Sequence, residues 1–118
     1  MPKNIANKVE LLQGTLDMLI LRTLQAGRAH GHQIAKHIQR TTEEVLQVEH
    51  GSLYPALHRL ERKGWIAAEW KASEFGPRLR IYRLTKSGRK QLAAERSRWV
   101  LMKEAIECIL NPAKRESE

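Results

Sequence analysis

Positively charged side chains are concentrated in the middle of this 118-residue chain. Residues 59–90 contain ten Lys and Arg against three Glu, which gives a net charge of +7 out of the total of +8. Residues 1–58 carry six positive against five negative side chains, and residues 91–118 carry five of each. Lys and Arg gathered in this way neutralise the phosphates of a nucleic-acid backbone, so the middle segment predicts a nucleic-acid-binding surface and not a generally basic protein.

A helix predicted from about residue 51 can present several of these groups together. Leu53, Leu57 and Leu60 follow helical spacing and predict its buried face. The remaining directions around this helix hold the predicted DNA-binding residues: Ser52, Tyr54, Pro55, His58, Arg59, Arg62 and Lys63.

Arginine and hydroxyl side chains suit this surface for different reasons. Arg59 and Arg62 can each hold the O6 and N7 atoms of guanine with both ends of the planar guanidinium, which discriminates between bases. The hydroxyls of Ser52 and Tyr54 can donate to phosphate near the start of the helix. The alternative is that the two arginines form a solvated face and that Tyr54 packs beside the following strands.

Three further cations, Lys71, Arg78 and Arg80, belong to the segment after this helix. They are predicted to reach backbone phosphates or the minor groove, which adds affinity with little sequence information. A plain solvated hairpin is the alternative. The concentration of charge in this part of the chain favours the DNA contact.

Trp99 and Met102 lie on an apolar stretch near the C-terminus. Aromatic side chains at that place can line a cavity between two copies of the chain, which would accept a small, flat, aromatic effector. The alternative is simple packing between the two copies, and both interpretations stay open.

The other reactive side chains do not form a recognisable catalytic or metal site. The spacing of the five histidines, His30, His32, His37, His50 and His58, does not match a metal-ligand set. The single cysteine, Cys108, is predicted to be a small core residue in a reducing compartment. With one Asp, no phosphate-binding glycine loop and no HExxH helix, the sequence predicts no enzymatic activity, no metal and no cofactor.

The elements that must position these residues begin with a helix. Apolar positions from Leu12 to Leu24 follow a three-to-four spacing and predict a helix that ends near Ala26. Thr15 is expected to be its N-cap, which places Asp17 in the first turn, where the helix dipole favours a carboxylate.

Two more helices are predicted before the cationic segment ends. The second covers residues 33–39, after a break at residues 27–31, and an apolar patch at residues 45–48 is either extended chain or one helical turn. The third begins near Gly51 or Ser52, so that Pro55 falls in its first turn, and it ends at Gly64.

Two strands and a long helix are predicted to follow. Residues 66–70 and 80–84 alternate apolar and polar side chains, and Gly76-Pro77 supplies the turn in a long connection whose tip is expected to be mobile. Thr85 is expected to cap a helix over residues 86–110, about 36 Å long, which a body of this size cannot cover alone. One apolar face of this helix is therefore expected to meet a second copy of the chain.

This order predicts a mainly α fold with a small β-hairpin, namely a winged helix-turn-helix followed by a C-terminal dimerisation helix. The expected divisions are a DNA-binding domain at residues 1–85, the dimerisation helix at 86–110 and a flexible tail at 111–118. The chain has neither a membrane-spanning apolar run nor an apolar signal block after Met-Pro-Lys-Asn-Ile, so a cytoplasmic protein is expected.

About four fifths of the sequence resembles the PadR family of bacterial transcriptional regulators. The segments that carry the resemblance are Gly14-Thr-Leu-Asp-Met-Leu-Ile-Leu, His30-Gly-His-Gln-Ile34, Gly51-Ser-Leu-Tyr-Pro-Ala-Leu57, Arg59-Leu-Glu61, Gly64-Trp-Ile66, Tyr82-Arg-Leu-Thr85 and Gly88. The sequence departs from the family pattern at His32, Ile81 and Phe75-Gly76-Pro77. The resemblance implies a homodimeric winged-helix repressor of pseudo-palindromic operator DNA, with Ser52 and Tyr54 at the DNA surface.

Residues and resemblance together predict a dimeric, sequence-specific DNA-binding regulator that represses transcription. Its expected partners are double-stranded operator DNA, a second copy bound through the C-terminal helix and a small aromatic effector, and no membrane. Two alternatives are a winged-helix module that binds an acidic protein, and a ligand or metal sensor for which DNA is a secondary partner.

Overall fold

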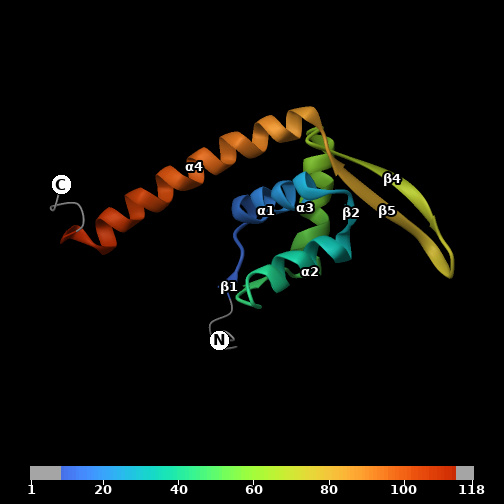
Figure 1. Cartoon of the computed structure of the whole chain (residues 1–118), viewed down its shortest axis with the longest axis horizontal. Helices are drawn as coiled ribbons and strands as arrows, with labels where there is room; N and C mark the ends of the chain where they lie inside the picture. The colour runs from blue at the N-terminus through green and yellow to red at the C-terminus, as the bar shows by residue number, and fades with distance from the viewer. Residues whose placement is uncertain (1–8, 114–118) are drawn as a thin grey trace.

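A computed structural model describes residues 9–113 of the chain. Helices α1 (Gln13–Ala26), α2 (Gly31–Thr41) and α3 (His50–Arg62) form the body, and strands β4 (Ile66–Ser73) and β5 (Gly76–Leu84) form a hairpin after α3. Helix α4 (Lys86–Leu110) follows the hairpin. In Figure 1 the hairpin and α4 meet at one corner of the body and extend from it in opposite directions. This arrangement confirms the predicted winged helix-turn-helix with a long C-terminal helix.

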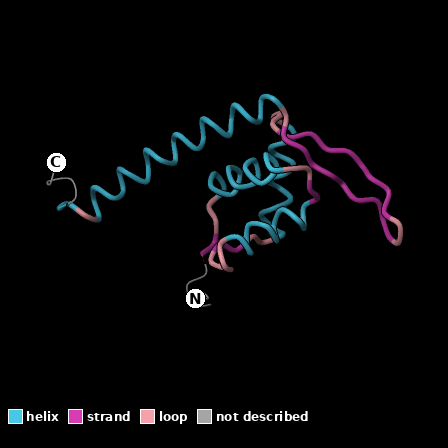
Figure 2. Tube along the Cα trace, viewed as in Figure 1, coloured by secondary structure: helices cyan, strands magenta, loops and turns pink. Residues whose placement is uncertain are grey.

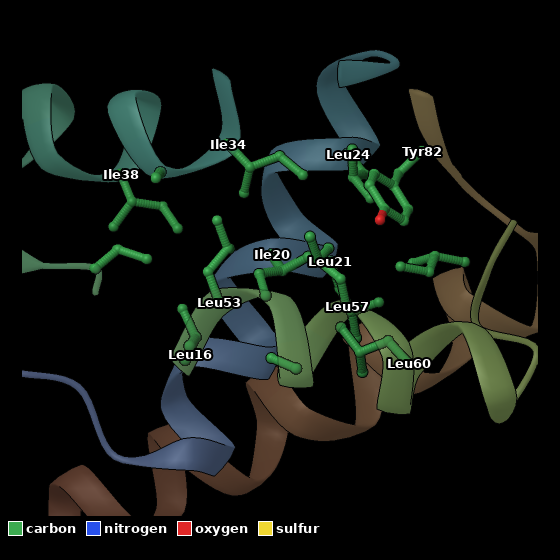
Figure 3. Close-up of a cluster of buried hydrophobic side chains, with 14 of the residues drawn as sticks. Leu16, Ile20, Leu21, Leu24, Ile34, Ile38, Leu53, Leu57, Leu60 and Tyr82 are labelled. Atoms are coloured by element: carbon green, nitrogen blue, oxygen red, sulfur yellow. The ribbon is translucent and has the colours of Figure 1, made fainter. Parts of the chain in front are cut away.

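The three body helices share one apolar core (Figure 3). The predicted buried stripe of α3 is confirmed, because Leu53, Leu57 and Leu60 are all fully buried. Fully burying such a side chain contributes about 1.5–3 kcal/mol each. The core fixes the rotation of α3 about its axis, and with it the side chains that α3 presents to solvent.

The start of α1 differs from the prediction. The helix begins at Gln13 with Leu12 at the N-cap position, and no side chain caps it. Thr15 is therefore inside the helix and is not its N-cap. Asp17 is not in the first turn either, and instead lies buried on the core-facing side of α1.

Helices α2 and α3 also begin earlier than predicted. Helix α2 starts at Gly31 because His30 caps it. Helix α3 starts at His50, because the carbonyl of Glu49 accepts from the backbone N–H groups of Ser52 and Leu53 at 3.0 and 2.9 Å. Pro55 therefore lies in the second turn of α3, where the prediction had placed it in the first.

Besides the hairpin, the chain forms short strands that belong to two different sheets (Figure 2). Strand β2 (Ala29–His30), which the sequence pattern did not reveal, pairs with β5, so the sheet has three antiparallel strands in the order β2-β5-β4. The apolar patch after α2 is extended, since β3 (Leu46–Gln47) pairs in parallel with β1 (Val9–Glu10).

The hairpin is longer and its turn tighter than predicted. Strand β4 runs to Ser73 and pairs there with Gly76, which leaves only Glu74 and Phe75 in the turn. Gly76-Pro77 belongs to β5 and not to a long connection. The cationic residues near the tip are therefore held on paired strands.

Helix α4 has the predicted boundaries and cap. The hydroxyl of Thr85 accepts from the backbone N–H of Gly88 at 3.0 Å and donates to the carbonyl of Gly64 at 2.7 Å. Gly88 is required at this join, since a Cβ there would lie 2.0 Å from the carbonyl oxygen of Trp65. These contacts fix the direction in which α4 leaves the body.

Beyond Leu92, the apolar side chains of α4 are largely uncovered. The exposed ones are Trp99, Val100, Leu101, Met102, Ile106, Ile109 and Leu110. Within residues 9–113, no helix is both long and apolar enough to cross a membrane. The start of the chain, read above for a signal block, and residues 114–118 of the predicted tail lie outside the described residues.

Candidate nucleic-acid interface

The exposed side of α3, the start of α2 and the hairpin enclose an open hollow of about 580 Å³. No carboxylate is among its lining residues, which are His30, Gly31, His32, Tyr54, His58, Trp70, Arg78, Leu79, Arg80 and Tyr82. Four predicted site residues from two separate elements are thus brought together: Tyr54 and His58 of α3 with Arg78 and Arg80 of β5. A concave surface with cations and without acidic groups is suited to a polyanion.

Helix α3 divides its predicted contact residues between two sides. Tyr54 and His58 face the hollow, whereas Ser52 and Pro55 line a second depression with Arg59 on the side of α1. Arg62 and Lys63, at the end of the helix, are exposed. The predicted contact residues are therefore divided between two depressions and the exposed end of the helix.

Tyr54 is partly seated against the neighbouring helix. Its phenol ring leaves so little room that a Cβ on Gly31 would lie 2.9 Å from the Tyr54 hydroxyl oxygen. The side chain nevertheless remains 41% exposed. Tyr54 thus joins α3 to α2 and keeps its hydroxyl at the surface of the hollow.

Arg59 is committed to an ion pair inside the protein. Its guanidinium donates to the carboxylate of Asp17 at 2.6 Å, and the two side chains are only 26% and 13% exposed. Burial raises the pKa of Asp17, and the adjacent Arg59 opposes that rise. Arg59 was predicted to face the DNA groove, but the structure places it between α3 and α1.

Two arginines of the hairpin are held over an aromatic ring. The guanidinium carbons of Arg78 and Arg80 lie 5.3 and 5.2 Å from the centre of Trp70, and Arg80 also pairs with Glu61 at 2.5 Å. Each such cation–π contact contributes about 0.5–1 kcal/mol at an exposed site. Trp70 is also the cross-strand partner of Arg80, so its ring helps to position these cations.

The remaining cations of the predicted site are unpaired. Among residues 9–113, Arg62, Lys63, Lys71 and Arg78 make no ion pair with a carboxylate, although Lys63 lies over the ring of Trp65 at 4.8 Å. A DNA phosphate that contacts these side chains would displace water and counterions, and would not have to compete with a carboxylate of the protein.

His30 is bound into the start of α2. Its Nδ1 accepts from the backbone N–H of Gln33 at 3.3 Å, and its own backbone N–H donates to the side chain of Gln33 at 3.0 Å. Burial, and to a lesser extent His32, lower the pKa of His30. The neutral ring is therefore the form that caps the helix.

Replacing His30 by Ala is expected to lower the free energy of unfolding by about 1 kcal/mol at pH 8. Because the folded-state pKa of His30 is lowered, the stability from the neutral cap is present above the usual histidine pKa and is lost as the pH falls through the folded value. The deficit should thus shrink steadily as the pH is lowered below the usual histidine range, as measured by urea unfolding at a series of pH values. His30→Asn, which retains a cap acceptor, should show no such loss at pH 8; an equal loss in both variants would contradict the capping role.

The two predicted effector-binding residues, Trp99 and Met102, line the same hollow. Both lie on α4, and Met18 and other residues of α1 also line this hollow of about 280 Å³. Within the described part of the chain, no group of three or more His, Cys, Asp and Glu side chains is arranged to hold a metal ion. Cys108 is partly buried and not a full core residue.

Known proteins share both the sequence pattern and this fold. Residues 20–94 match the transcriptional regulator PadR-like family. The transcriptional regulator Rv3488 of Mycobacterium tuberculosis is 31% identical over 87 residues, which cover 74% of this chain and 78% of that protein.

Solved structures agree with this match. A transcriptional regulator from Clostridium thermocellum superposes with a TM-score of 0.75 at 33% identity, over 80% of this chain and 92% of that one. A PadR family transcription regulator from Clostridium difficile gives 0.70 at 28% identity, over 81% and 98%. These proteins are described as regulators and not as enzymes. The chain therefore belongs to the PadR-like family of transcriptional regulators.

Proposed function

We propose that the protein is a homodimeric, sequence-specific DNA-binding repressor that acts in the cytoplasm. Helix α3 would enter the major groove, and the hairpin of β4 and β5 would lie along the phosphate backbone as a wing. The observation that carries this proposal is the hollow in which Tyr54 and His58 of α3 meet Arg78 and Arg80 of the wing without any lining carboxylate. Such a surface supports a duplex partner more than an acidic protein, because a helix followed by a wing is the arrangement with which winged-helix proteins approach the groove and the backbone of DNA.

The uncovered apolar side of α4 supports the dimer. Ile106, Ile109 and Leu110 are 49%, 78% and 69% exposed and lie within about 100° of one another around the helix axis. Apolar residues at this density on one element are typical of a surface that pairs. Two copies joined through α4 would present two α3 helices to half-sites about one helical turn apart.

Replacing Arg62 by Ala is expected to weaken operator binding by about 5- to 150-fold and to relax the base preference, because one good bidentate contact is worth about 1–3 kcal/mol. Arg62 is exposed and has no carboxylate partner among residues 9–113, so the change should leave folding intact. The measurement is a gel-shift titration with the operator and with variants of it.

Lys71→Ala is the matched variant, because it removes an exposed wing cation. It should weaken binding to all duplexes by a similar factor, with a smaller dependence of affinity on salt. If both variants bound the operator as the unchanged protein does, the assignment of α3 to the groove would be wrong.

An effector-dependent form of this function is favoured by the hollow beside Trp99, in which Met18 of α1 and Met102 of α4 supply apolar side chains and Glu95 and Arg98 supply charged ones. A flat aromatic compound bound there is expected to change the tryptophan fluorescence and to alter operator affinity. Replacing Met102 by Glu should abolish the fluorescence change. Compounds that leave both signals unchanged would leave packing between two copies as the role of this region.

A further inference from the structure

Histidine side chains gather beside the proposed DNA surface. The rings of His30 and His32 stack with their centres 6.4 Å apart and their planes at 13°. His32 also meets His50 edge to face at 6.4 Å, and His50 meets Tyr54 at 5.8 Å. His30, His32 and His50, called here the histidine row, thus run from α2 to α3 across the helix-turn-helix.

The surroundings of the row are cationic and aromatic. From β5, the hollow beside it is lined by Arg78, Arg80 and Tyr82, and from α3 by His58. No carboxylate lines that hollow, and Glu61 is already paired with Arg80. The acidic residue adjacent to the row along the chain is Glu49, which precedes His50.

A proton added to the histidine row would place a positive charge close to the arginines of β5. Histidine is the side chain that changes charge between pH 5 and 8, and neighbouring cations oppose that change. A phosphate group placed against the row would reverse the balance, since it supplies the opposite charge that the lining residues lack. Binding of an anion and uptake of protons would then be coupled.

We propose that the histidine row binds a backbone phosphate of DNA in its protonated form, so that the protein holds its operator more tightly as the pH falls from 8 to 6. This inference rests on the proposed function. His32 and His50 carry the effect because both are exposed. His30 orders the row, because its Nδ1 is engaged with Gln33 and its ring stacks on His32. Burial, and to a lesser extent His32, lower the pKa of His30, in keeping with a neutral ring that accepts from Gln33.

Among the described residues, no set of three or more ligand side chains has an arrangement that would hold an ion. The three rings are near one another, with His32 stacked on His30 and edge to face with His50.

The test is a titration of a fluorescent operator duplex with the full chain at pH 8 and pH 6, at constant ionic strength and in a buffer without phosphate. Affinity is expected to rise by about tenfold or more at pH 6, and a tenfold rise over these two pH units corresponds to a mean uptake of about half a proton per dimer on binding. The slope of log affinity against log salt should also steepen at pH 6, by up to about 0.9 for each phosphate newly contacted.

The variant His32→Gln/His50→Gln keeps two polar, exposed side chains and leaves the cap at His30 intact. Relative to its own affinity at pH 8, it should gain less than about twofold at pH 6. His37→Gln is the matched control, because His37 is exposed on α2 and does not line the hollow. It should retain the full tenfold gain.

The outcomes separate this inference from the proposed function. Absence of operator binding at both pH values would contradict the proposed function itself. Operator binding that is equally tight at pH 8 and pH 6, or a gain that persists in His32→Gln/His50→Gln, would overturn the role of the row and leave the proposed function standing. Millimolar inorganic phosphate and chloride of matched ionic strength are expected to weaken operator binding equally, because the proposed ligand is a phosphate of the duplex. If free phosphate weakened operator binding more than chloride at pH 6, the row would be assigned to that anion instead.

Discussion

Replacing Ile106 by Glu is expected to convert the dimer to a monomer and to weaken operator binding by about 100-fold or more. Ile106 is half-exposed on the uncovered side of α4, one heptad beyond Trp99. A carboxylate there would have to be buried between two copies without a partner, which is costly. Loss of the dimer also removes the gain from binding two half-sites at once, which amounts to a factor of about 100 to 10,000. Sedimentation velocity and a gel-shift titration measure the two effects.

Ser97→Glu is the control for this variant. It adds the same charge to α4, on an exposed position that points away from the side of Ile106 at 100° per residue. It should remain dimeric and should bind the operator with little change. A dimeric Ile106→Glu protein, or equal loss in both variants, would show that α4 does not pair the two copies in this way.

Replacing Arg59 by Ala is expected to lower the free energy of unfolding by about 3 kcal/mol at pH 7, because the carboxylate of Asp17 is left buried without its partner. Only 13% of the Asp17 side chain is exposed, so water cannot replace the guanidinium. Urea unfolding at a series of pH values measures the loss.

The deficit of Arg59→Ala should shrink as the pH falls from 7 towards 4. Burial already raises the pKa of Asp17, and removal of Arg59 takes away the contact that opposes this rise. The carboxyl group of the variant therefore takes up a proton at a higher pH when folded, and the neutral form costs less to bury. A deficit that grew on acidification would contradict the assignment.

Arg62→Ala provides the matched comparison, because it removes the same charge from an exposed position three residues along α3. It should change stability by less than about 0.5 kcal/mol while it weakens operator binding. The sequence grouped both arginines as groove contacts. The two variants are expected to differ, because Arg59 stabilises the fold and Arg62 binds the operator.

Elements with a strong local pattern were predicted well. The leucine stripe of α3 is buried, and α4 has the boundaries and the Thr85 cap that its sequence indicates. Both depend on neighbours within one or two turns, which a sequence displays directly. Strand β2 was missed, since two residues carry no period and Ala29 and His30 are ordered by pairing with β5.

The site was predicted as a set of residues rather than as a set of contacts. The concentration of charge in residues 59–90 identified the wing and α3, and the structure brings Tyr54, His58, Arg78 and Arg80 to one hollow. Counting charges does not reveal which of them are already paired. The partner of Arg59 lies 42 residues away along the chain, so only the packing of α1 against α3 shows that this arginine is engaged.

The central claim is that α3 and the wing of a dimer read duplex DNA, and selection of bound sequences from a random duplex pool tests it most directly. The account predicts an enriched inverted repeat whose half-site centres lie about one helical turn apart, near 34–36 Å, and a loss of information within each half-site for Arg62→Ala. A pool that shows no enriched motif after selection, or a motif unchanged by Arg62→Ala and Lys71→Ala together, would contradict it.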